Sequence, residues 1–141
     1  ENRWFRGPHR KHTKNSPFSV DGVESLPRVD VIYITADVSP DLIDAAVKNG
    51  AKGIVTAGVG NGNMTGPALA AVKAAVAKGV VVVRASRVTS GTVGRNVEVN
   101  DDEAGTVASV ELNPPRARVL LKLALLKTTD PAEIQRYFYE Y

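Results

Sequence analysis

The residues best suited to chemistry form a glycine-rich loop at positions 58–63, which reads Gly-Val-Gly-Asn-Gly-Asn. Its glycines let the backbone take positive φ angles and let a ligand approach closely. The carboxamides of Asn61 and Asn63 supply hydrogen-bond donors and acceptors. A helix expected from about Pro67 would direct free backbone amides to the same place. The loop therefore indicates a site for a small polar or anionic ligand, with a plain tight turn as the structural alternative.

Two well-known nucleotide-binding motifs do not fit this loop. A dinucleotide-binding motif would need a third glycine at the position of Asn63, and it would follow the first strand of its unit instead of the second. A P-loop needs Gly-Lys-Ser/Thr at the start of the helix, and this loop has no lysine. Neither motif is therefore predicted.

Side chains that could form a catalytic set are scattered along the sequence. The only histidines, His9 and His12, stand beside Pro8 and basic residues, a pattern typical of an exposed connector instead of a metal site. Nothing in the spacing brings Ser86 or Ser109 to these histidines, so a Ser-His-Asp triad is not predicted.

Thr35 and Asp37 stand at the end of an expected strand, and a threonine hydroxyl can act as a nucleophile. No lysine or other base accompanies them in the sequence, so we do not predict a catalytic role for Thr35. The absence of cysteine excludes disulfides, thiolate nucleophiles and cysteine-based metal sites. No cluster of residues calls for a metal or a cofactor, and neither is expected.

The elements that must position the loop alternate between strands and helices. Apolar and β-branched runs predict the strands, and apolar residues at helical spacing, closed by glycine, predict the helices. The expected order is a strand at 29–35, a helix capped by Ser39 and ending at Gly50, a strand at 53–56, a helix at about 67–79 and a strand at 80–83. This βαβαβ series predicts a parallel sheet with flanking helices, whose ligands bind beyond the carboxyl ends of the strands.

The second half of the chain predicts a long loop and two more helices. The polar segment 85–102 is long for a plain connection, which favours a functional loop or a small hairpin. A helix capped by Asn113 continues through 119–126, and its nearly all-round hydrophobicity predicts burial. A last helix capped by Asp130 carries an apolar stripe at 134, 137, 138 and 141.

Length and composition indicate a single globular domain with an appended N-terminal segment. The chain has 141 residues, of which 43% are hydrophobic and 23% charged, and no apolar run reaches the roughly 18 residues of a membrane-spanning helix. The net charge is +3, with basic residues gathered in the first fourteen positions. Because no aromatic pattern accompanies these charges, they favour a solvated connector over a nucleic-acid surface. We expect neither a nucleic-acid nor a membrane partner.

The first 27 residues carry short apolar patches between prolines, including Trp4-Phe5, which predict a strand or hairpin followed by a connector. The chain opens at Glu1 instead of Met, so we expect a fragment or a processed product.

A series of short segments occurs in an order and spacing that are typical of one family. They are Arg10–Thr13, Ser25–Pro27, Gly53–Val55, Ala57–Asn63, Ser86–Val88, Glu98–Val99, Leu112–Pro114, Ala117–Leu121, Leu123–Leu125 and Asp130–Pro131. With them the sequence resembles the type II bacterial L-asparaginases over essentially its whole length. The resemblance implies a small Rossmann-like or flavodoxin-like α/β domain at 29–141, a connector at 21–28, and at 1–20 the end of a larger N-terminal domain.

The resemblance also implies an activity for the longer protein. Enzymes of this family hydrolyse L-asparagine to L-aspartate and ammonia, often with lesser action on L-glutamine. A threonine hydroxyl attacks the amide with help from a second threonine, an aspartate and a lysine, and the acyl-enzyme is then hydrolysed. These groups belong to the N-terminal domain, in motifs such as Thr-Gly-Gly-Thr, which this sequence lacks. The chain by itself is therefore expected to be inactive.

In this family each active site is assembled between two subunits of an intimate dimer, within a homotetramer. The neighbour's small domain supplies an asparagine and a glutamate, which correspond by motif position to Asn63 and Glu98. Glu98 would pair with the α-ammonium group of the substrate, and Asn63 would bridge substrate and catalytic groups. The resemblance further implies a periplasmic or secreted location.

The sequence departs from the family pattern at a few positions. Thr65-Gly66 replace a bulkier pair such as Tyr-Lys, Ala85 replaces a serine, and Glu111 replaces a small residue. These changes concern the interface and the preference between asparagine and glutamine. From the residues alone, two other functions stay open: a stand-alone α/β module that binds a small ligand without catalysis, and a structural interaction domain in which the loop is only a turn.

Overall fold

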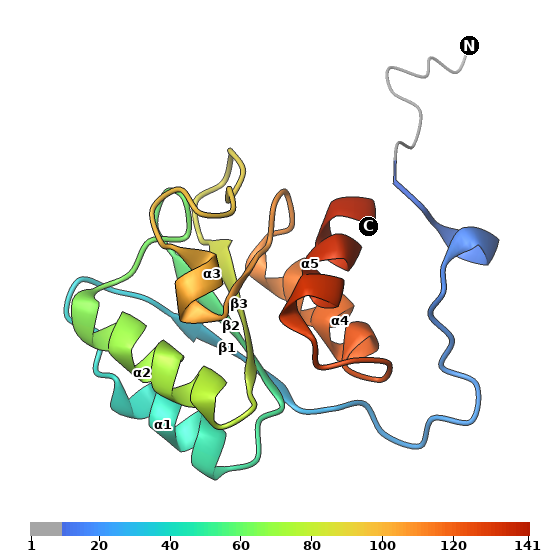
Figure 1. Cartoon of the computed structure of the whole chain (residues 1–141), viewed down its shortest axis with the longest axis horizontal. Helices are drawn as coiled ribbons and strands as arrows, with labels where there is room; N and C mark the ends of the chain where they lie inside the picture. Colours follow the sequence, from blue (N-terminus) through green and yellow to red (C-terminus); the bar gives the residue numbers. More distant parts are fainter. Residues whose placement is uncertain (1–9) are drawn as a thin grey trace.

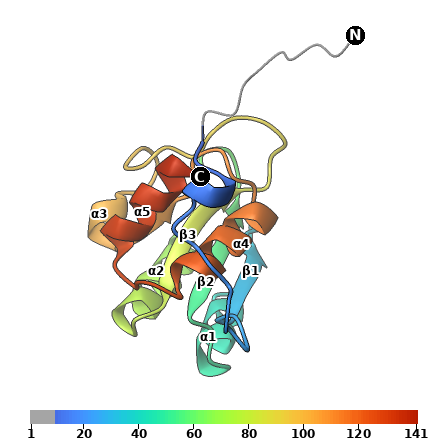
Figure 2. The ribbon, with the colours of Figure 1, turned by 90° about the vertical axis from the view of Figure 1, so that its right-hand side faces the viewer.

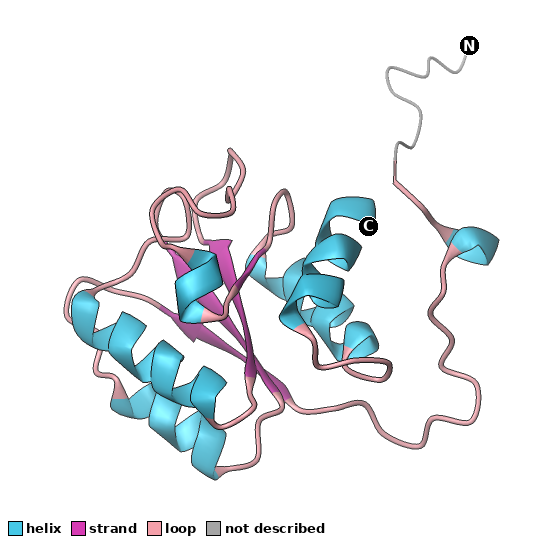
Figure 3. Ribbon diagram, viewed as in Figure 1, coloured by secondary structure: helices cyan, strands magenta, loops and turns pink. Residues whose placement is uncertain are grey.

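The computed structural model describes residues 10–141 and contains four parallel strands between two layers of helices (Figures 1 and 3). The strands are β1 (Val29–Tyr33), β2 (Gly53–Gly58), β3 (Val81–Ser86) and β4 (Val107–Ala108). The helices are α1 (Asp41–Lys48), α2 (Gly66–Ala77), α3 (Asp101–Ala104), α4 (Pro114–Ala124) and α5 (Pro131–Glu140), and a short 3-10 turn covers Thr13–Asn15.

The strands lie in the order β1-β2-β3-β4, so each strand pairs with the next one in the chain. The predicted α/β class with a parallel sheet and flanking helices is confirmed. Because the order advances in one direction, the sheet lacks the reversal that creates a switch point in the doubly wound Rossmann and flavodoxin orders. The strands expected at 53–56 and 80–83 extend further, to Gly58 and Ser86, and bring polar residues to the end of the sheet.

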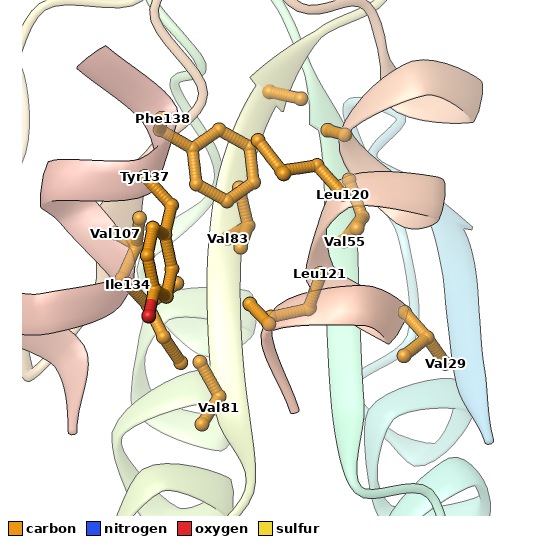
Figure 4. Packing of buried hydrophobic residues seen from close by; sticks show 13 residues of the cluster. Val29, Val55, Val81, Val83, Val107, Leu120, Leu121, Ile134, Tyr137 and Phe138 are labelled. Atoms are coloured by element: carbon orange, nitrogen blue, oxygen red, sulfur yellow. The ribbon is translucent and has the colours of Figure 1, made fainter. Parts of the chain in front are cut away.

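The two faces of the sheet support separate apolar clusters because successive strand residues point to opposite sides. Ile54 and Val82 face α1 and α2, whereas Val55 and Val83 face α4 and α5. Figure 4 shows the second cluster, in which Leu121 and other residues of α4 and α5 meet the strands. Helices therefore pack on both faces of the sheet. The loops that follow the carboxyl ends of β2 and β3 lie at the top of Figure 1.

Side-chain caps begin two of the helices where the sequence predicted them. Asn113 accepts a hydrogen bond from the backbone amide of Arg116 at the start of α4, and Asp130 caps α5 in the same manner. The predicted cap at Ser39 is wrong. Pro40 takes the cap position with a helical backbone, φ −65° and ψ −17°, and its ring has no acceptor that could bond to the helix.

The expectation that the helix after Asn113 is well buried holds for one face of the helix only. Val119 of α4 is 56% exposed, and it borders an apolar groove of about 520 Å³ that Phe18, Leu123 and Tyr141 also line. The reason is that the sheet and α5 cover only part of this helix. Among the described residues no helix is long and apolar enough to cross a membrane.

The N-terminal segment runs along α4 and α5 (Figure 2). Phe18 packs edge-on against Tyr137 and Tyr141, with ring centroids 5.0 and 5.3 Å apart, and Lys11 pairs with Glu140 at 2.9 Å. Residues 10–27 contain no strand, so the predicted strand or hairpin is wrong for this part. Trp4-Phe5, Pro8, His9 and the first two basic residues lie outside the described residues. The assignment of residues 1–20 to another domain stays a prediction.

Replacing Leu121 by alanine should lower the free energy of unfolding by about 3 kcal/mol, because this fully buried side chain links α4 to the sheet. Val119→Ala, on the exposed side of the same helix, should change it by less than about 0.5 kcal/mol. Urea unfolding of the two variants and the parent chain measures both values. Equal losses in the two variants would contradict the assigned packing.

Candidate functional site

The glycine-rich loop after β2 closes tightly on itself. The backbone amide of Asn63 donates to the carbonyl of Val59 at 2.8 Å, and the amide of Val59 donates back at 3.2 Å. A Cβ atom at Gly58 would lie only 2.4 Å from the carbonyl oxygen of Asn63, so this turn requires glycine there. Gly62 has a φ of +72°, which also favours glycine. The loop thus delivers the Asn63 side chain at the carboxyl end of β2, just before α2.

The structure brings the two predicted binding residues together, although they stand 35 positions apart. The side-chain nitrogen of Asn63 lies 3.4 Å from a carboxylate oxygen of Glu98, at hydrogen-bond distance. The side-chain oxygen of Asn63 accepts from the backbone amide of Met64 at 2.8 Å, which fixes the plane of the carboxamide. Glu98 is exposed and Asn63 half-buried. An exposed carboxylate beside an oriented amide can receive a cationic and polar ligand, and the role of both residues toward a substrate stays a prediction.

Glu98 belongs to the segment expected as a functional loop or small hairpin at 85–102. The structure has a loop here, because β3 ends at Ser86, α3 begins at Asp101, and no strand lies between them. An isolated bridge between Val93 and Val110 ties the middle of the loop to the chain after β4.

A buried ion pair joins this loop to the glycine-rich loop. The guanidinium of Arg84 contacts the carboxylate of Asp101 in a bidentate manner, at 2.6 and 2.7 Å, and both side chains are fully buried. The remaining donors of Arg84 reach the backbone carbonyls of Asn61 at 2.9 Å, Gly62 at 3.4 Å and Gly94 at 3.1 Å. One side chain in the second half of β3 therefore contacts the backbone of both loops.

Asp101 is held in its charged form by its neighbours. Burial would raise the pKa of this carboxyl, but hydrogen bonds from Arg84, Thr106 and the backbone of Asn96, with the charge of Arg84, outweigh burial and lower the pKa below its usual value. A direct link between the loops lies alongside, where the amide of Gly94 donates to the side-chain oxygen of Asn61 at 2.6 Å.

Sequence reasoning missed Arg84 and Asp101. The available signal was a cation directly after four valines in a strand expected to be buried on both faces. Such a cation needs a buried carboxylate partner, but nothing in the sequence says which acid supplies it.

Within residues 10–141, no hydrogen bonds join the other candidate side chains into a catalytic set. Thr35 lines a hollow of about 300 Å³ together with Asn63, Thr65 and Arg87, so this candidate nucleophile lies near the site. Asp37, two positions on, is exposed.

Ser86 lines a different hollow, of about 160 Å³, and its hydroxyl accepts from the amide of Val88 at 3.3 Å. Ser109 is fully buried, with no hydrogen-bond partner for its hydroxyl within residues 10–141. The ring of His12 lies beside the hydroxyl of Thr13 at 3.3 Å, whereas His9 falls outside the described part of the chain. The same part of the chain has no group of three His, Asp or Glu side chains that could hold a metal ion.

Comparison with known proteins settles the family. Residues 28–138 match the glutaminase/asparaginase C-terminal domain. The chain belongs to this family. The loop at 58–63, β3 with Arg84, and the Glu98 loop all fall within the part of the chain that matches this C-terminal domain.

Several relatives of this glutaminase/asparaginase C-terminal domain extend the match over nearly the whole chain. A probable periplasmic L-asparaginase of Haemophilus influenzae is 47% identical over 136 residues, which are 96% of this chain and 39% of that protein. L-asparaginase 2 of Bacillus subtilis is 50% identical over 94% of this chain and 35% of that protein. A glutaminase-asparaginase of Acinetobacter glutaminasificans is 43% identical over 98% of this chain and 43% of that protein. The chain thus spans roughly two fifths of the length of these relatives, and the predicted resemblance is confirmed.

Asp101→Asn should make the folding stability of the chain less dependent on pH in the acidic range. Because the folded-state pKa of Asp101 is lowered, its stabilising contribution is complete above the unfolded-state pKa of about 3.9 and disappears as the pH falls through the folded-state value. The parent chain should therefore lose stability below about pH 4, whereas Asp101→Asn starts less stable at pH 7 and loses less. Urea unfolding at a series of pH values measures the slope of the unfolding free energy against pH.

Asp102→Asn is the matched control, because Asp102 pairs with Arg95 at the exposed surface, where solvent weakens the interaction. The stability of this variant should fall with decreasing pH almost as steeply as that of the parent chain. An Asp101→Asn chain with the same slope as the parent would contradict the assigned role of the buried carboxylate.

Proposed function

We propose that this chain is the C-terminal domain of a longer L-asparaginase, which hydrolyses L-asparagine to L-aspartate and ammonia. The observation that carries the proposal is the meeting of Asn63 and Glu98 at 3.4 Å, in a domain of the glutaminase/asparaginase family. The relatives named above support it, since their names are those of L-asparaginases and glutaminase-asparaginases.

In the proposed mechanism this domain binds and orients the substrate and does not cleave the amide. The carboxylate of Glu98 accepts hydrogen bonds from the α-ammonium group, an interaction between opposite charges that is stronger than a neutral hydrogen bond. The carboxamide of Asn63, oriented by Met64, contacts substrate and catalytic groups through its nitrogen and oxygen. The attacking threonine and its helpers are supplied by the N-terminal domain of the longer protein.

The proposed active site lies between two subunits, with Asn63 and Glu98 reaching the catalytic groups of the neighbour. The exposure of Glu98 supports this arrangement, because a carboxylate that serves another subunit must project from its own domain. The proposed assembly is a homotetramer, built as a pair of intimate dimers. We propose a periplasmic or secreted location, which the name of the Haemophilus influenzae relative supports.

L-glutamine is proposed as a second substrate. The hollow of about 300 Å³ beside Asn63 is lined by the small side chain of Thr65, where a tyrosine would fill part of the space. The extra methylene of glutamine could be accommodated there. The names of the glutaminase-asparaginase relatives agree with this second activity.

Glu98→Gln in the full-length protein should raise the KM for L-asparagine by roughly ten- to a hundredfold, because the charge-assisted hydrogen bond to the α-ammonium group is weakened. Steady-state measurement of ammonia release gives KM and kcat. Glu103→Gln is the matched control, since Glu103 is an exposed acid five positions away that pairs with Lys73. An unchanged KM in Glu98→Gln, or ammonia release by the 141-residue chain alone, would contradict the proposed roles.

Co-expression of two variants, one weakly active and one inactive, should raise activity above that of either alone if the site lies between subunits. One variant carries Glu98→Gln, and the other lacks the attacking threonine of the N-terminal domain. In a mixed dimer one of the two symmetric sites has both groups intact, so random assembly should recover about a quarter of the wild-type sites. The assay uses L-asparagine well below the KM of Glu98→Gln. A mixture no more active than its components would place the whole site within one subunit.

A further inference from the structure

We infer that Arg84 and Asp101 are a positioning pair that sets the separation of Asn63 and Glu98. Neither side chain can touch a substrate, since both are fully buried. They act on the two site residues through the backbone of the loops that carry them. The effect on the reaction rests on the proposed function, whereas the effect on the loops does not.

On the Asn63 side, the guanidinium of Arg84 contacts and supports the backbone of the glycine-rich loop. Its Nη1 donates to the carbonyls of Asn61 and Gly62, the two residues directly before Asn63. A Cβ atom at Gly62 would lie 3.2 Å from this nitrogen, which shows how closely the loop backbone rests on it. A shift of the guanidinium must therefore move the residue that leads into Asn63.

On the Glu98 side, the pair fixes the loop both before and after the glutamate. Nη2 of Arg84 donates to the carbonyl of Gly94 at 3.1 Å, and the carboxylate of Asp101 accepts from the amide of Asn96 at 2.9 Å. The amide of Asp101 in turn donates to the side-chain oxygen of Asn96 at 2.8 Å. Only Val97 and the two residues 99–100 separate Glu98 from these fixed points.

The shape of the arginine side chain explains why one residue can hold both loops. Its planar fork presents donors in fixed directions, and here they serve a carboxylate and three carbonyls from two loops. A lysine at this position would keep the positive charge but could not contact all these acceptors at once. Substitution by lysine therefore removes this arrangement of hydrogen bonds but keeps the positive charge.

The test compares Arg84→Lys with Arg118→Lys in the full-length protein. Arg118 offers a matched control, since its Nε donates to the carbonyl of Val29 at 2.8 Å, at the start of β1 and away from both loops. Well below the unfolding temperature, Arg84→Lys should raise the KM for L-asparagine about tenfold, because misplaced binding groups lose affinity. Arg118→Lys should leave KM unchanged. A merely structural role would reduce the folded fraction, and hence the apparent kcat, without a change in KM.

A double mutant separates positioning from any independent effect. If Arg84 acts through Glu98 as well as Asn63, then Arg84→Lys should raise the KM of Glu98→Gln by clearly less than its tenfold effect on the wild-type protein, because the part of the effect transmitted through Glu98 is already lost. A further tenfold increase in the double mutant would overturn the proposal.

Hydrogen exchange provides a readout that does not depend on activity. Arg84→Lys should speed exchange in peptides that cover 58–65 and 92–100, and Arg118→Lys should not. If Arg84→Lys fails to fold, Asn61→Ala takes its place, because it removes the bond from the amide of Gly94 at the surface end of the same network. Unchanged exchange in both loops would overturn the proposal. A wild-type protein that releases no ammonia would refute the proposed function, while the exchange result would still decide whether the pair holds the loops.

Discussion

The bidentate contact between Arg84 and Asp101 is the interaction on which the site end of this domain depends. Removing both charges from water is costly, and the attraction between them offsets that cost only when their other polar atoms are also satisfied. Backbone carbonyls from both loops, with the hydroxyl of Thr106 and the amide of Asn96, supply those partners. The dependence is mutual: the loops take their shape around the pair, and the pair can stay buried only because the loops surround it.

This arrangement explains how a sheet without a switch point can carry the candidate site. In doubly wound sheets a crevice opens where the strand order reverses, whereas here the order advances from β1 to β4. The polar residues Asn63 and Glu98 instead lie on the loops that follow β2 and β3, and these two strands are direct neighbours in the sheet. Arg84, two residues before the end of β3, lies opposite Thr56 of β2 and so stands next to the strand that leads into the glycine-rich loop. Strand pairing and the ion pair together fix the distance between the loops.

Much of this architecture follows from local sequence patterns. The β-branched runs gave the positions of β1, β2 and β3, and the caps Asn113 and Asp130 gave the starts of α4 and α5, because these signals act over a few residues. β4 and α3 were not predicted, since elements of two and four residues are too short for a periodic pattern. The partner of Arg84 could not be predicted either, because it stands 17 positions away and pairing across a loop leaves no local trace. Glu98 was found only through the family resemblance, as an exposed acid in a polar loop has no pattern of its own.

The contact between Asn63 and Glu98 has a physical consequence for the proposed function. A flexible carboxylate would lose conformational freedom when it binds a cationic group, and that loss would weaken the affinity. Here the backbone before and after Glu98 is already fixed, and the side chain already has a donor in Asn63. An incoming ammonium group then meets a carboxylate whose direction is set, and the ordering was completed when the domain folded. The buried ion pair of Arg84 and Asp101 thus does more than stabilise the folded domain, because it also fixes the geometry of two loops at the surface, which is the property that a binding site requires.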